Sequence, residues 1–120
     1  MGRNNRVGQW GEERAGEYLR RKGYEILARS WRSRYGEIDL IARKGRFLAF
    51  VEVKLRKNAN FAQAMEFVDS RKQQKLRLTA ELYLAQNPTE LQPRFDVIEI
   101  YAPEGEHTAN LRINHLEDAF

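Results

Sequence analysis

Acidic residues and a lysine interrupt two short apolar stretches of this sequence. Residues 36–42 read Gly-Glu-Ile-Asp-Leu-Ile-Ala, and residues 50–54 read Phe-Val-Glu-Val-Lys. Both stretches are rich in Ile, Leu, Val and Phe, which favours β-strands. Charged groups within buried strands are unfavourable unless they are paired or bound to a metal. An acid on one strand followed by Glu-x-Lys on the next can hold a divalent cation and activate water against a phosphodiester, so the pattern indicates a nuclease-type site.

A tight turn at residues 45–46 would join these two stretches into a β-hairpin. With glycine first in a two-residue turn, Asp39 lies opposite Glu52, and Glu37 lies opposite Lys54. Opposed side chains share a face of the sheet and lie about 5 Å apart at Cβ, and residues two apart on one strand also share a face. We therefore expect these four side chains to form one patch.

Two carboxylates at that separation repel each other, and a divalent cation would remove the repulsion. Mg²⁺ or Mn²⁺ is the expected cofactor, because such hard cations take carboxylate and water oxygens as ligands. Lys54 would position the attacking water or stabilise charge in the transition state, and Glu37 would support the ligands from beside the metal. The alternative is a structural hairpin whose polar face meets solvent and whose intervening aliphatic residues form the buried face.

A glutamate on the first predicted helix is a further candidate. Residues from about 9 to 22 have the apolar spacing of an amphipathic helix, and a glycine follows the basic last turn. Glu12 lies three residues before Ala15 and seven before Leu19, so it shares their inward stripe. It could reach the metal directly or through a water. The alternative is a first-turn acid that the helix dipole stabilises.

The remaining pattern predicts an α/β protein with the order α-β-β-β-α-β. The further segments are a strand over 24–28, a basic loop over 29–35, a polar connection over 58–64, a helix over 66–86, a strand over 94–101, a short last strand over 109–113 and a docked tail over 115–120. Helices at both ends of a three-stranded meander predict an α/β sandwich around a mixed sheet. At 120 residues, we expect a single domain, residues 1–120.

The composition is that of a globular protein with a mild basic excess. The 21 basic and 17 acidic residues give a net charge of +4, and the absence of cysteine excludes disulfides and cysteine zinc sites. No apolar run approaches the roughly 20 residues of a membrane span, and the N-terminus lacks a signal core, so we expect a cytoplasmic protein with no membrane partner. The candidates for phosphate contact are Arg34, Arg56, Lys72 and Lys75. The alternative for these residues is a solvated surface.

Together these motifs resemble the restriction endonuclease-like, or PD-(D/E)xK, nuclease superfamily. The pattern is most similar to the bacterial YraN family of uncharacterised proteins. The resemblance extends from Gly-x-x-Gly-Glu-x-x-Ala at residues 8–15, through residues 36–42 and residues 50–56, to Lys72 and to Arg-Phe-Asp-Val at residues 94–97. We interpret the Arg and Asp of that last motif as a structural ion pair.

The resemblance, which extends to archaeal Holliday-junction resolvases, implies a restriction endonuclease-like α/β/α sandwich. It also implies that Glu12, Asp39 and Glu52 are catalytic metal ligands or lie next to them, and that Lys54 is the catalytic lysine. The proline that the superfamily carries before its aspartate is replaced by Ile38, and this proline is not chemically required.

The function that these residues and the resemblance imply is a metal-dependent endonuclease. Its expected partner is nucleic acid, in particular DNA, with branched or repair intermediates as substrates and a homodimer as one way to cut two strands. Two alternatives remain. One is a nucleic-acid-binding module of the same fold without catalysis, and the other is an adaptor whose basic patches bind acidic protein partners.

Overall fold

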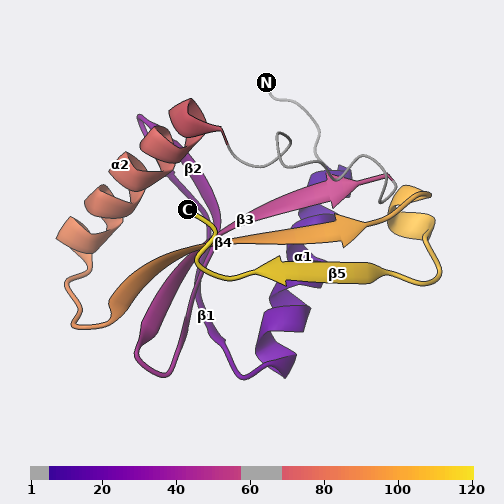
Figure 1. Cartoon of the computed structure of the whole chain (residues 1–120), viewed down its shortest axis with the longest axis horizontal. Coiled ribbons are helices and arrows are strands. Elements are labelled where there is room, and N and C mark those ends of the chain that lie inside the picture. The colour runs from indigo at the N-terminus through magenta and orange to yellow at the C-terminus, as the bar shows by residue number, and fades with distance from the viewer. Residues whose placement is uncertain (1–5, 58–68) are drawn as a thin grey trace.

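A computed structural model describes residues 6–57 and 69–120 of the chain (Figure 1). The elements are α1 (Arg6–Arg21), β1 (Glu25–Ser33), β2 (Gly36–Lys44), β3 (Phe47–Arg56), α2 (Ser70–Gln86), β4 (Gln92–Tyr101), the 3-10 turn η3 (Gly105–His107) and β5 (Arg112–Leu116). The predicted connection at 58–64 and the predicted start of the second helix at 66–68 lie outside the described residues. Within the described ranges, no helix has the length and apolar character needed to cross a membrane.

The strands form one mixed sheet in the order β1-β2-β3-β4-β5. Strand β3 pairs with β4 in parallel, and the other three neighbouring pairs are antiparallel. Helix α2 lies between β3 and β4 in the chain, as expected because parallel neighbours need a crossover connection. The antiparallel pairs β1–β2 and β2–β3 are joined by short turns, and Gly45 in the second turn has a φ of 59° that suits glycine.

The helices cover opposite faces of this sheet, and each face has its own hydrophobic core. On one face, Ala15 and Leu19 of α1 pack against Leu40 and Val51. On the other, α2 packs Leu76, Ala80 and Tyr83 against alternate residues of the same strands. Figure 1 shows α1 passing behind β3, β4 and β5, with α2 beside β2. The predicted α/β/α sandwich with a central mixed sheet is confirmed.

Helix α1 approaches the sheet closely at Gly11. A Cβ atom added at this glycine would lie only 3.1 Å from Cδ2 of Leu55, which is closer than ordinary van der Waals contact. Because Gly11 is buried, the small residue lets the helix backbone rest against β3. The next residue, Glu12, is thereby held near the strands.

Two predicted segments differ from the structure. The basic segment 29–35, expected to be a loop, is mostly the second half of β1, and Arg29 and Trp31 pair there with β2. The last strand begins at Arg112 rather than at residue 109, so His115 belongs to the strand and not to a tail. In both places tertiary pairing with a neighbouring strand outweighs a weak local β pattern.

Arg94 and Asp96 form the predicted ion pair, with Nη2 of Arg94 2.9 Å from Oδ2 of Asp96. Asp96 also accepts hydrogen bonds from the backbone N–H of Asp118 and, at 2.8 Å, from Nε2 of His115. Burial alone would raise the pKa of Asp96, but the hydrogen bonds from His115 and Arg94 hold it below its usual range. This cluster around the fully buried Asp96 fastens the C-terminal strand to the sheet, and we interpret its role as structural.

Candidate metal centre

The candidate site lies where β2 and β3 separate. Their ladder runs from Lys44 opposite Phe47 to Leu40 opposite Val51, which confirms the predicted register over this stretch. The predicted pairs of Asp39 with Glu52 and of Glu37 with Lys54 lie beyond the ladder. There, Oδ2 of Asp39 accepts a hydrogen bond of 2.8 Å from the backbone N–H of Val53. The Asp39 carboxylate therefore lies in the gap between the two strands and takes the place of a backbone partner.

The alternation of β2 changes at Asp39. Ile38 packs in the core beneath α2, whereas Leu40 packs in the core beneath α1, although residues two apart on a regular strand share a face. The strand is therefore irregular between these positions, and both Glu37 and Asp39 line a cleft with residues of α1. The neighbouring strand is irregular at the same level, since Ser30 of β1 has a φ of 47°, which is uncommon for a residue other than glycine.

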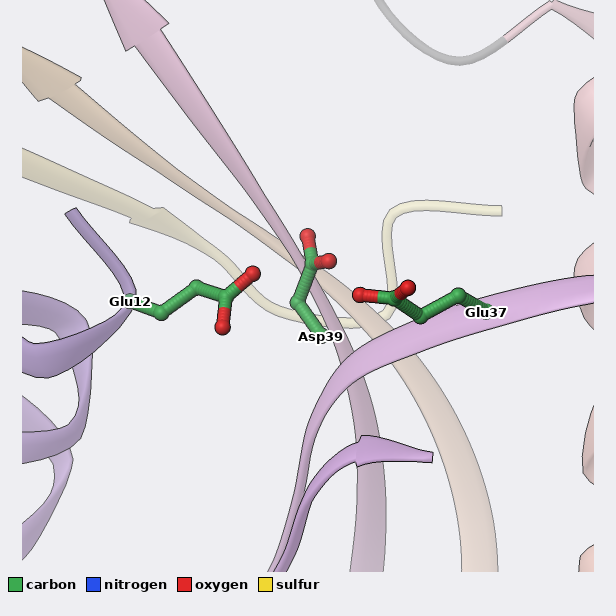
Figure 2. Close-up of side chains that lie close together, drawn as sticks. All are labelled: Glu12, Glu37 and Asp39. Atoms are coloured by element: carbon green, nitrogen blue, oxygen red, sulfur yellow. The ribbon is translucent and has the colours of Figure 1, made fainter. Parts of the chain in front are cut away.

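Three carboxylates meet in this cleft. One oxygen each from Glu12, Glu37 and Asp39 lies within 4.8 Å of the other two. Figure 2 shows Asp39 between the other two carboxylates, with Glu12 reaching in from α1 and Glu37 from β2. The cleft has a volume of about 270 Å³. Three acidic oxygens that converge in this way match the ligand preference of a divalent cation such as Mg²⁺ or Mn²⁺.

The cluster carries unfavourable negative charge. Burial raises the pKa of Asp39 to about 8, and the charges of Glu52, Glu12 and Glu37 add to this rise, while the hydrogen bond from Val53 opposes it. Burial also raises the pKa of Glu12, against a hydrogen bond from Ser30. A cation bound among these groups would remove the repulsion, so the donor set fits a metal.

Glu52 is buried on β3 and contacts two lysines. Its Oε2 is 3.7 Å from Nζ of Lys54 and 3.6 Å from Nζ of Lys72 on α2. Glu37 and Asp39 meet Glu12 of α1, whereas Glu52 contacts Lys72 of α2, and the convergence of Glu37, Asp39, Glu52 and Lys54 in one patch stays a prediction. The two sets still interact, since the charge of Glu52 raises the pKa of Asp39.

The other predicted phosphate contacts are not among the residues that line the cleft. The Arg56 guanidinium is 3.3 Å from Glu99 and its side chain is only 10% exposed. Arg34 is exposed in the β1–β2 turn and donates a hydrogen bond to the hydroxyl of Tyr35. Lys75 is exposed on α2. Lys72, by contrast, contacts Glu52 of the candidate site.

Two residues of the site were missed by the sequence analysis. Ser30 donates a hydrogen bond of 3.2 Å from Oγ to Oε1 of Glu12. Arg32 donates one of 3.0 Å from Nε to Oε1 of Glu37. Both lie in the segment that was expected to be a loop. The signal that could have found them is the alternation of polar and larger residues through β1, which is typical of a strand.

The fold and the site define a mixed α/β sandwich with an acidic cleft where two central strands diverge. Residues 11–100 match the Uncharacterised protein family UPF0102, and the chain belongs to this family. The resemblance to the YraN family is thereby confirmed.

Curated relatives match over nearly their whole length. A UPF0102 protein of Caldanaerobacter subterraneus is 44% identical over 95% of this chain and 93% of its own. The UPF0102 protein of Syntrophomonas wolfei is 42% identical over 98% of this chain and 99% of its own. That of Rhodococcus opacus is 41% identical over the full length of both.

Proposed function

We propose that this protein is a metal-dependent endonuclease that hydrolyses phosphodiester bonds in DNA. The observation that carries the proposal is the convergence of Glu12, Glu37 and Asp39 within 4.8 Å of one another in an open cleft. The raised pKa of Asp39 supports it, because a half-buried acid among other acids indicates a group arranged for a cation or for chemistry.

The three carboxylates would hold Mg²⁺ or Mn²⁺. Ser30 orients the Glu12 carboxylate through its Oγ, and the backbone N–H of Val53 fixes Oδ2 of Asp39. Two different elements therefore hold the ligands before any cation arrives. Bound there, the cation would lower the pKa of a water molecule and neutralise charge on the attacked phosphate.

Glu52 and its two lysines would act from the other side of the gap. Glu52 forms ion pairs with Lys54 and Lys72, and its charge also acts on Asp39. Lys54 is 31% exposed in its side chain, which leaves it able to meet a phosphate. In this proposal Lys54 stabilises negative charge that develops on the phosphate oxygens, and Glu52 positions it.

The proposal is tested by incubating supercoiled plasmid, a branched DNA junction and single-stranded DNA with the protein and either metal. We expect metal-dependent cleavage of at least one substrate and its loss in Asp39→Asn. The matched control is Glu25→Gln, which removes an exposed acid at the far end of β1 and should leave cleavage unchanged. If the wild type cleaves none of the substrates with Mg²⁺ or Mn²⁺, the proposal is wrong. DNA binding without cleavage would then favour the non-catalytic module.

A further inference from the structure

Arg32 occupies an unusual place at the mouth of the acidic cleft. Arg32 is on β1 and lies directly opposite Glu37 of β2. Its Nε donates a hydrogen bond of 3.0 Å to Oε1 of Glu37. Its side chain is 78% exposed and lines the cleft. A positively charged group is thus held beside the carboxylates by one of the acids themselves.

Stability does not explain this arrangement well. Exposed cross-strand ion pairs contribute little to folding, because both groups are well solvated without each other. A guanidinium carries five N–H donors in a planar fork. The hydrogen bond to Glu37 uses one of them, so the fork has donors left for a second acceptor that approaches the open side of the cleft.

Positive groups flank the acids on both sides. Arg32 is paired with Glu37 on the β1 side, and Lys54 and Lys72 are paired with Glu52 on the α2 side. The negative charges of Glu52 and Glu37 both raise the pKa of Asp39. A polyanion that enters the cleft would be repelled by the carboxylates unless cations on each side compensate the charge.

We propose that Arg32 binds a phosphate of the nucleic-acid backbone on the β1 side of the cleft. This inference rests on the proposed function and adds a binding residue that neither the sequence motifs nor the family match indicates. The planar fork of arginine suits two phosphate oxygens at once. Glu37 positions the guanidinium from one side, and the phosphate oxygens would accept hydrogen bonds from its N–H groups on the other side.

The test measures DNA binding in the Asp39→Asn background, in EDTA and over a series of salt concentrations, so that binding is measured without cleavage. The probe is a short fluorescein-labelled DNA duplex followed by anisotropy. The chain offers a close control in Arg43, which pairs with Glu25 across the same two strands, 2.8 Å apart at the other end. We therefore compare Arg32→Ala with Arg43→Ala.

We expect Arg32→Ala to weaken binding about fivefold and to lower the slope of log affinity against log salt by about 0.9, as the loss of one phosphate contact should. Arg32→Lys should keep most of the slope, and Arg43→Ala should change neither quantity. Mn²⁺ binding to Arg32→Ala, in an otherwise wild-type chain, should be retained or tighter, because a competing positive charge has been removed.

Equal binding by the parent and Arg32→Ala would overturn the inference and leave the proposed function standing. Loss of Mn²⁺ binding together with DNA binding would show that Arg32 only shapes the cleft, and would also overturn it. If the Asp39→Asn parent binds no duplex at all, the inference fails, and the metal-dependent cleavage assay decides the proposed function independently.

Discussion

Replacing Asp39 with Asn tests whether repulsion among the carboxylates of the acidic cluster destabilises the metal-free protein. The pKa of Asp39 is raised to about 8 in the folded protein, against about 4 in an unfolded chain. Between these values the folded state keeps a proton that the unfolded state has lost. Stability of the metal-free protein therefore falls as pH rises from about 4 to about 8. Asn keeps the shape and can still accept the hydrogen bond from Val53, but it does not ionise.

The size of the effect follows from the shift. About four pKa units correspond to an upper limit of about 5 kcal/mol for ionising Asp39 at pH 8. The cleft opens to solvent and its side chains can rotate apart, which relieves part of the repulsion. We expect Asp39→Asn to be about 2 kcal/mol more stable than the wild type at pH 8 in EDTA, and to show little difference near pH 4.

Urea unfolding at both pH values, followed by circular dichroism, measures this difference. The control is Asp118→Asn, because Asp118 is exposed and its φ of 54° also suits asparagine. This variant should not change the pH dependence. If Asp39→Asn gains no stability over the wild type between pH 4 and pH 8, the carboxylates do not repel each other as the geometry implies.

Three further predictions concern the metal, the helix and the buried ion pair. Mn²⁺ at ten times its dissociation constant should stabilise the wild type by about 1.4 kcal/mol, or about 5 °C in Tm, and should not stabilise Asp39→Asn; an equal shift in both would refute this. Gly11→Val should lower stability by about 1–3 kcal/mol in thermal unfolding, since even a Cβ there would crowd Leu55; an unchanged Tm would contradict the close approach. Asp96→Ala should cost about 3–5 kcal/mol in urea unfolding because it removes the carboxylate that compensates the charge of the largely buried Arg94 side chain, and a loss below about 1 kcal/mol would argue against a structural role.

Much of the fold was predictable because its signals are local. The glycine at position 45 fixes a two-residue turn, and this turn sets the register of β2 against β3 for several residues. The apolar stripes of the two helices indicate which sides they bury. The ion pair of Arg94 and Asp96 was also predictable, because two opposite charges two residues apart on one strand compensate each other when they are buried.

The geometry of the site was less predictable because it depends on an irregularity. A regular β2 would place Glu37 and Asp39 on the same side as Glu52. The change of alternation next to Asp39 and the positive φ of Ser30 instead turn the acids toward Glu12. No sequence pattern marks that change, because it arises where two strands part and a carboxylate replaces a backbone partner. Such local strain is frequent at functional sites.

The expected homodimer and the cytoplasmic location stay predictions. The dimer is of interest because one cleft can attack only one strand of a duplex at a time. Analytical ultracentrifugation of the protein with and without the fluorescein-labelled duplex would measure it. A protein that stays monomeric in both conditions would have to cut each strand in a separate event.

The most direct test of the central claim is an anomalous difference map from a crystal of this protein grown with Mn²⁺. The account predicts a peak among the carboxylates of Glu12, Glu37 and Asp39, and no such peak for Asp39→Asn. A wild-type crystal that holds Mn²⁺ elsewhere, or holds none under saturating metal, would contradict it.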